Sequence, residues 1–366
     1  MTRKNGKIEI MRFVFCILVL LYHCNTQFKG MAMRYPGGLC FTPAYRGYIG
    51  VEFFFIVTGF LFAKKLSKTD GIKSDNLGKD TIQFMWKKYA SIFPIHIVAF
   101  VILFVMYAIV ERYSGTALLN FFVRTLPNAL LLNKTGLDVL NINHVEWYLS
   151  CMLIALFILY PIARANYSVF SKIICPIAGI LVVGASIKLN GSVVSNANTL
   201  IISDCIFRAI SEICLGVAAF ELARHFDSQA FTKGGKVLLS IAENALYLIV
   251  ICYAISNADK RFDGIAVLLL TVAVAISFSS NSLHTKLTFT KFAYFLGSAS
   301  LPIYVTQLIS FYIANNFFAD KTWGFKVVFV LLNTIVVSAI CKCGEIALRK
   351  ANGWVKKKMV REKEAV

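Results

Sequence analysis

Long apolar stretches recur along the whole chain, separated by short polar segments. Stretches long enough to cross a bilayer occur at 8–28, 47–66, 90–111, 144–164, 172–188, 199–223, 237–256, 263–280, 291–315 and 325–349. The first stretch has no small-residue cleavage site, which favours a retained helix over a removable signal. The pattern predicts an all-α, polytopic membrane protein with about ten transmembrane helices.

Composition and charge agree with this fold class. Hydrophobic residues make up 58% of the chain and charged residues 16%, which excludes a soluble domain of this length. Lysine and arginine are more than twice as frequent in the segments that a ten-helix count puts inside, so both termini are expected in the cytoplasm. The same bias explains much of the net charge of +19, and no nucleic-acid partner is expected. We expect a transmembrane domain at 1–349 and a basic cytoplasmic tail at 350–366.

Two ionisable residues, Arg12 and His23, lie in the first apolar stretch. Eleven helical steps rotate by three turns plus about 20°, so both side chains share one face, about 16 Å apart along the axis. Ionisable groups inside a membrane are candidates for function. The pair suggests an anion bound near one surface and proton transfer deeper in the membrane. The alternative is that Arg12 orients the helix as a snorkelling charge and His23 is a packing residue.

Other polar residues are expected at the depth of His23. Glu52 enters the second span from the opposite side, where its carboxylate would orient the imidazole and stabilise its protonated form. Gln307, in the ninth span, reaches a similar level and could orient a substrate. At the start of the fourth span, Asn143 and Trp147 are suited to an acceptor such as a sugar, or else form an interfacial anchor.

Two further charged groups have a structural and a functional interpretation. Asp204, Arg208 and Glu212 follow each other at four-residue steps, which predicts a buried ionic clamp or, less favoured, a substrate path. Lys87 and Lys88 lie with Arg12 on the predicted inner side, where they suit a polyphosphate ligand or reflect charge bias alone. The Cys341-Lys342-Cys343 spacing is too short to predict a zinc site, and no metal is expected.

These residues occur in motifs that resemble the acyltransferase family 3 membrane proteins. The similarity rests on Arg12 and His23 with ten residues between them, followed by GVEFFFIVTGF at 50–60. Weaker matches are KKYASIFP at 87–94, WYLS at 147–150 and LGSASLPIY at 296–304. The resemblance covers about residues 5–310. The chain departs from the family pattern at Ser91, Met152 and Gln307, where members commonly have arginine, glutamate and histidine.

The resemblance implies an integral membrane O-acyltransferase that takes acyl-coenzyme A from the cytoplasm. Arg12 and Lys88 would meet the coenzyme's phosphates and His23 would be the catalytic histidine. We expect transfer of an acyl group, acetyl in the first instance, to a hydroxyl of a cell-surface polysaccharide or lipid-linked sugar at the inner or plasma membrane. His23 would act as a general base or as a transient acyl carrier, and both routes stay open.

Two other functions fit the same features. A transporter or flippase for a lipid-linked sugar or small anion would use Arg12, His23, Glu52 and the Arg208 face as its path. Against it, the sequence has no internal repeat and no matching pair of interrupted spans. A non-enzymatic membrane partner that keeps the fold is the third possibility. Activity toward an acyl-coenzyme A thioester would distinguish the enzyme from both.

Overall fold

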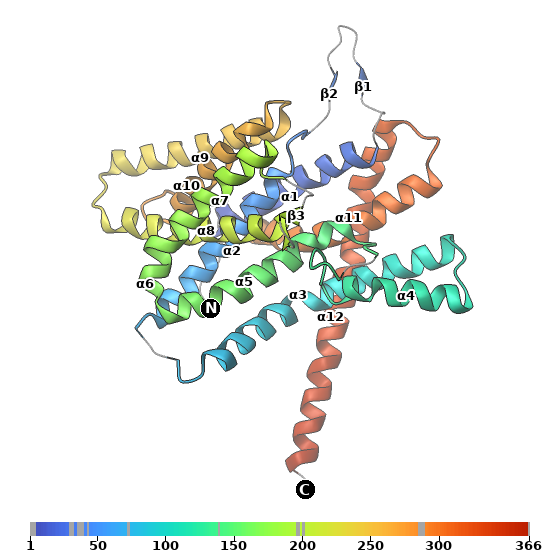
Figure 1. Ribbon diagram of the computed structural model, residues 1–366. Coiled ribbons are helices and arrows are strands. Elements are labelled where there is room, and N and C mark those ends of the chain that lie inside the picture. The colour runs from blue at the N-terminus through green and yellow to red at the C-terminus, as the bar shows by residue number, and fades with distance from the viewer. Residues whose placement is uncertain are drawn as a thin grey trace. The chain divides into compact units, whose positions relative to one another are not determined.

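The computed structural model describes residues 5–28, 33–34, 40–41, 44–71, 74–137, 140–194, 198–199, 202–284 and 290–364. Helices dominate these residues (Figure 1). Two short antiparallel strand pairs are also present, β1 (Met33–Arg34) with β2 (Cys40–Phe41) and β3 (Asn198–Thr199) with β4 (Ile202–Ser203). The predicted all-α class is therefore confirmed.

The helices follow one another with short connections. Their bounds are α1 Gly6–Gln27, α2 Ile49–Leu66, η1 Ser67–Thr69, α3 Leu77–Val110, α4 Gly115–Ala129, η2 His144–Glu146, α5 Trp147–Ala165, α6 Tyr167–Val169, η3 Phe170–Ile174, α7 Cys175–Asn190, α8 Asp204–Ser228, α9 Lys233–Ile255, η4 Lys260–Phe262, α10 Asp263–Phe278, α11 Lys291–Phe317 and α12 Trp323–Glu364.

Helices lie at all ten predicted ranges, and eight helical segments of the described residues are long and apolar enough to cross a membrane. These are α1, α3, η2 with α5, α6 to α7, α9, η4 with α10, α11 and α12. The other two predicted spans, α2 and α8, contain more charged side chains, among them Glu52, Arg208 and Glu212. The protein is a multi-pass membrane protein. Ten spans with both termini in the cytoplasm stay a prediction.

The chain forms two compact units. The first comprises Met1–Met85, Lys134–Gly136 and Trp147–Ser300, and the second comprises Trp86–Asn133, Leu137–Glu146 and Leu301–Val366. In the first unit α8 packs against α2, α5, α7 and α10, and its contact with α2 is the most extensive. The charged helix α8 is thus surrounded by helices of its own unit, which is how its ionisable groups are tolerated.

Glycines bring α2 close to its two neighbours. A Cβ atom at Gly59 would lie 2.0 Å from the carbonyl oxygen of Ile213, and one at Gly216 would lie 2.1 Å from that of Ile56. At Gly50 it would lie 2.6 Å from the carbonyl oxygen of Phe15 in α1. Side chains at these positions would push the helix backbones apart. The two glycines of the 50–60 motif therefore set the spacing of α1, α2 and α8.

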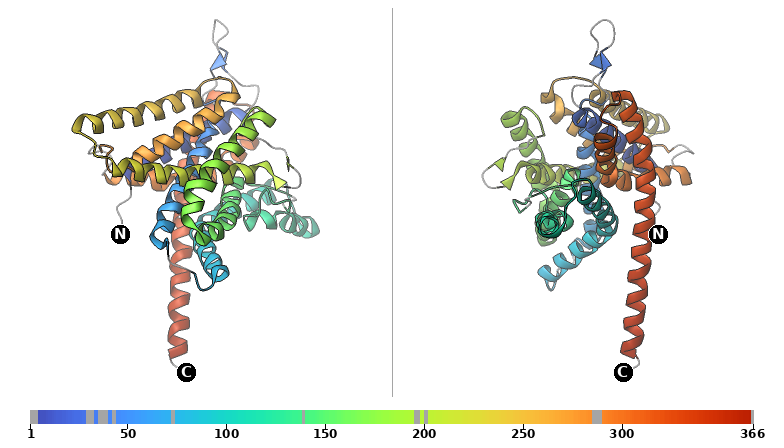
Figure 2. Two further views of the ribbon diagram at one scale, coloured as in Figure 1. Left: turned by 60° about the vertical axis from the view of Figure 1, so that its left-hand side comes forward. Right: turned by 90° about the vertical axis from the view of Figure 1, so that its right-hand side faces the viewer.

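The second unit contains most of α3, all of α4, the C-terminal part of α11 and α12. Figure 2 shows α12 as one continuous helix that runs to the C-terminal end. Residues 350–364 of the expected tail continue α12 as helix, and 365–366 lie outside the described residues. Near the start of the predicted tail, Arg349 bonds Glu345 at 2.8 Å and donates to the carbonyl oxygen of Ser91 at 2.7 Å.

Candidate active site

Arg12 and His23 belong to the single unbroken helix α1, so the same-face arrangement expected from their spacing follows from the helix itself. Asn5 caps its start by accepting hydrogen bonds from the backbone N–H groups of Lys7 and Ile8. His23 is half-buried, and its ring lies 5.5 Å from that of Tyr22. Arg12 keeps 29% of its side chain exposed. Both side chains are therefore accessible from outside the helix packing.

Glu9 orients Arg12, and the sequence analysis missed this residue. Nη1 of Arg12 donates to the two carboxylate oxygens of Glu9 at 3.4 and 3.2 Å. Glu9 in turn fits against Gly297, where a Cβ atom would lie 1.8 Å from Oε2 of Glu9 and 2.6 Å from its Cβ. The glycine of the late motif thus leaves room for the carboxylate that holds Arg12. This links two motifs that are far apart in the sequence.

The register of α1 and α2 corrects the expected depth of Glu52. Gly50 lies against Phe15 and Val19, and the rings of Phe15 and Phe53 stack at 4.6 Å. Glu52, which lies between Gly50 and Phe53, is therefore level with residues 15–19. His23 is at least four residues further along α1, about 6 Å along the axis. The expectation that His23 and Glu52 share one depth was wrong. Glu52 lies beside the middle of α1, whereas His23 lies nearer to the C-terminal end of this helix, so the span boundaries misplaced the two helices along each other.

Glu52 forms a buried ion pair with Arg208 of α8. Nε of Arg208 donates to Oε2 of Glu52 at 3.0 Å, and Nη2 donates to Oε1. Glu212 completes the group, with Oε1 3.6 Å from Nε of Arg208. The expected clamp between Arg208 and Glu212 is present, but the tighter partner, Glu52, comes from another helix. Four-residue spacing predicts ion-pair partners within one helix, but it gives no information about partners on other helices.

Arg208 also connects the pair to Trp147. Its guanidinium carbon lies 5.1 Å from the centre of the Trp147 ring, within cation–π range. Of the predicted site residues, Glu52 and Trp147 therefore contact Arg208, and Arg12 has its own partner in Glu9.

The remaining predicted residues lie in the second unit. Lys87 is exposed and Lys88 half-buried, both on α3. Asn143 and Gln307 are each 1% exposed. Nδ2 of Asn143 donates to the carbonyl oxygen of Val305 at 3.0 Å, and Nε2 of Gln307 donates to that of Tyr304 at 2.8 Å. The second unit thus brings the two amides to the same turn of α11, while Oδ1 of Asn143 has no hydrogen-bond partner among the described residues.

A second histidine, which the sequence analysis did not single out, is fully buried in this unit. Nδ1 of His96 lies 2.9 Å from Oε1 of Glu146, and Nε2 lies 3.0 Å from the carbonyl oxygen of Ala129. Both ring nitrogens face acceptors, so the imidazole and the carboxyl group share protons between them. A ring bonded on both sides cannot accept a proton from a substrate. His96 is therefore a structural residue.

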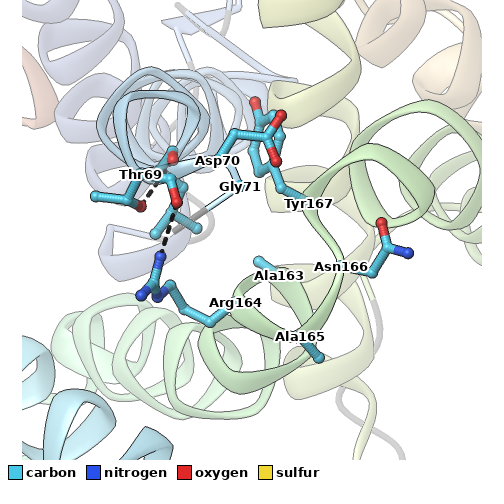
Figure 3. Close-up of a pocket in the computed structure, with 9 residues that line it drawn as sticks. Thr69, Asp70, Gly71, Ala163, Arg164, Ala165, Asn166 and Tyr167 are labelled. Atoms are coloured by element: carbon cyan, nitrogen blue, oxygen red, sulfur yellow. Dashed lines mark hydrogen bonds between the residues drawn. The ribbon is translucent and has the colours of Figure 1, made fainter. Parts of the chain in front are cut away.

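A polar cavity of about 230 Å³ lies in the first unit, where α2 ends and α5 meets α6 (Figure 3). Thr69, Asp70, Arg164 and Asn166 line it, with Tyr167 at its side. Arg164 points across the cavity and donates to the carbonyl oxygen of Thr69 at 3.0 Å. The cavity lining includes none of the predicted site residues. It is a separate feature from the Arg208 cluster.

Comparison with known proteins identifies the family. The family model described as an acyltransferase domain matches residues 5–343, nearly the whole chain. The chain belongs to this family, which confirms the resemblance found in its motifs, and it is a multi-pass membrane acyltransferase. No curated protein and no solved structure matches the chain significantly.

Proposed function

We propose that this protein is an O-acyltransferase that moves an acyl group, acetyl in the first instance, from cytoplasmic acyl-coenzyme A to a hydroxyl group of a cell-surface polysaccharide or lipid-linked sugar. It would work in the inner or plasma membrane. The observation that carries this proposal is the pairing of Arg12 and His23 on one accessible face of α1 in a chain of the acyltransferase family. A phosphate-binding cation and a proton-transfer group on the same helix are what such a reaction requires.

Arg12 is the proposed anchor for the coenzyme's phosphates. Both of its bonds to Glu9 use Nη1, so Nε and Nη2 have no hydrogen-bond partner within the described residues. A guanidinium offers five donors, and a phosphate can take two of them side by side. Lys87 and Lys88, one exposed and one half-buried, are proposed to add charge for the remaining phosphates.

His23 is the proposed catalytic residue. As a general base, its imidazole takes the proton of the acceptor hydroxyl while the oxygen attacks the thioester carbonyl. The tetrahedral intermediate then expels the coenzyme thiolate, which receives the proton from the imidazolium. As an acyl carrier, one imidazole nitrogen attacks the thioester and expels the coenzyme thiolate, which takes the proton of the other ring nitrogen. The acceptor hydroxyl then attacks the acyl-imidazole, and its proton passes to the imidazole that leaves. The first route predicts sequential kinetics and the second an acyl-enzyme.

The proposed acceptor contacts are Trp147, Asn143 and Gln307. Trp147 offers an aromatic face that is half-buried, a surface suited to the apolar side of a sugar ring. Asn143 has a buried amide oxygen without a partner among the described residues, which a hydroxyl donor would satisfy. The role proposed for Glu52 is to hold Arg208 beside Trp147, in place of the expected part as the partner of His23.

The test is an acyl-transfer assay in proteoliposomes with radiolabelled acetyl-coenzyme A. Wild type is compared with His23→Ala and with His225→Ala, which removes an exposed histidine of α8 as a matched control. Labelled acid or labelled acceptor should form with wild type and with the control variant, but not with His23→Ala. Retained acylation by a folded His23→Ala protein would refute the mechanism. Transport of a lipid-linked sugar without thioester cleavage would support the transporter instead.

A further inference from the structure

Three ionisable side chains meet inside the first unit and are almost completely shielded from solvent. Glu52 and Glu212 are both 0% exposed and Arg208 is 5% exposed. Arg208 bonds both oxygens of Glu52, whereas its nearest atom to Glu212 is at 3.6 Å. Within the described residues, both carboxyl oxygens of Glu212 lack a hydrogen-bond partner. The two carboxyl groups are therefore held very differently.

The charges of this cluster do not balance if both carboxyl groups are ionised. Arginine keeps its proton in proteins, so the guanidinium contributes one positive charge. Two carboxylates would leave one uncompensated negative charge in a buried site, which is costly. Glu52 and Glu212 also lie on the same guanidinium, so a charge on one disfavours a charge on the other. Two such carboxyl groups that share a single cation avoid the cost when one of them keeps a proton.

The geometry decides which carboxyl group is neutral. Glu52 accepts two bonds from the guanidinium, an arrangement that strongly favours the ionised carboxylate. Glu212 lies beyond hydrogen-bond distance of the same guanidinium, so it gains less from ionisation. Among the described residues, Arg208 is the only cation within 4.0 Å of either carboxyl group. The contacts therefore favour Glu212, and not Glu52, as the carboxyl group that keeps a proton.

Groups on the helices around α8 do not change this balance. From α5, Tyr148 is a buried phenol, which adds no charge. On α10, Asp263 accepts hydrogen bonds from two tyrosines and a serine elsewhere in the unit. On α7, Lys188 is exposed near the C-terminal end of its helix. Cys205, one turn before Arg208, is a buried thiol.

We propose that Glu212 is a neutral carboxylic acid at pH 7 and that Arg208 is a positioning residue of the reaction centre. The second half of this proposal rests on the acceptor role proposed for Trp147. The guanidinium is held by two bonds to Glu52, and its central carbon lies 5.1 Å from the centre of the Trp147 ring. The neutral acid at Glu212 lets Arg208 remain with Glu52, because a second carboxylate would compete for the same guanidinium. The cluster thereby fixes the orientation of the aromatic surface that would meet the acceptor.

Two substitutions test which of the two carboxyl groups is neutral and which is ionised. Glu212→Gln replaces a neutral acid by a neutral amide of the same shape, so the protein should fold and its thermal unfolding temperature should stay close to that of wild type. Glu52→Gln removes the ionised partner and should lower that temperature clearly. Infrared spectra of wild type at pH 7 should contain the carbonyl stretch of a protonated carboxylic acid that is missing from Glu212→Gln. None of these measurements needs acyl-coenzyme A, so they fail or succeed independently of the proposed function.

The positioning role has its own measurement. Arg208→Lys keeps the positive charge but loses the pair of hydrogen bonds to Glu52 and most of the contact with the Trp147 ring. We expect the KM for the acceptor to rise about tenfold, the size of effect that a desolvated cation–π contact and one charge-assisted bond would give. Acetyl-coenzyme A affinity should change less than about twofold. A purely structural residue would lower activity by loss of folded protein and leave the acceptor KM unchanged.

The opposite results overturn the proposal. If Glu212→Gln destabilises the protein as much as Glu52→Gln, or fails to fold, Glu212 is an ionised partner of Arg208 and the neutral-acid assignment is wrong. The same holds if the infrared band is absent from wild type. If Arg208→Lys changes the affinity for acetyl-coenzyme A and the KM for the acceptor equally, Arg208 does not act through Trp147.

Discussion

Replacing Gly59 by alanine should separate α2 from α8 and disconnect Glu52 from Arg208. The added Cβ would lie 2.0 Å from the carbonyl oxygen of Ile213, and ordinary contact begins near 3.4 Å. The obstacle is helix backbone, so the two helices must move apart by about 1.4 Å at this point. An equal shift at the ion pair would lengthen the 3.0 Å bond from Arg208 beyond hydrogen-bond distance. Overpacking of this kind costs about 1–3 kcal/mol, before any loss from the ion pair.

Thermal unfolding of the detergent-solubilised protein measures this effect. Cys205 and Cys214 of α8 are buried, so a thiol-reactive fluorophore will report the loss of this packing as they become exposed. The matched control is Gly184→Ala in α7, because a Cβ atom there would meet nothing within 4 Å. Alanine is the better helix former, so the control should unfold at or slightly above the wild-type temperature. Equal unfolding temperatures for Gly59→Ala and wild type would refute the close approach of α2 and α8.

The remaining predictions concern single side chains. His23→Ala should lower acyl transfer by more than about 100-fold with an unchanged unfolding temperature, and a fully active variant would remove His23 from the chemistry. Arg12→Ala should raise the KM for acyl-coenzyme A about tenfold with little change in kcat, whereas an unchanged KM would assign Arg12 to helix orientation. Glu9→Gln should have a smaller effect in the same kinetic assay, because the cation remains; an equal loss would mean that Glu9 itself contacts the coenzyme. His96→Ala should destabilise the protein by about 3–5 kcal/mol in denaturant unfolding by leaving Glu146 buried and unpaired, and wild-type stability would contradict that pairing.

The fold was largely readable from the sequence because bilayer-length apolar stretches mark helices directly. All ten predicted ranges contain helices, including 172–188, where α6, η3 and α7 run on without a break. The ambiguous members are α2 and α8, whose charges keep them from standing out as apolar spans. Those charges are tolerated because the two helices pack against each other and against neighbours. Hydropathy alone does not contain that information.

The candidate site could be predicted only in part from the sequence. Spacing within one helix was sufficient for the shared face of Arg12 and His23 and for the approach of Arg208 to Glu212. Pairing across helices was not, because depth counted from span boundaries carries an error of a turn or more. Glu52 was therefore matched to His23, although its carboxylate binds Arg208. The available sequence signal was the pair of glycines, Gly59 and Gly216. Without a side chain at these positions, α2 and α8 approach closely enough to form that bond.

The most direct test of the central claim is acetyl-coenzyme A binding to the purified protein, measured by calorimetry. Wild type, Arg12→Ala and His23→Ala are compared, with Lys188→Ala as a control that removes an exposed cation far along the sequence from the site residues. We expect the affinity to fall about tenfold in Arg12→Ala and to be retained in His23→Ala and in the control. If folded wild type binds neither acetyl- nor longer acyl-coenzyme A, the protein does not use this acyl donor and the proposed function is wrong.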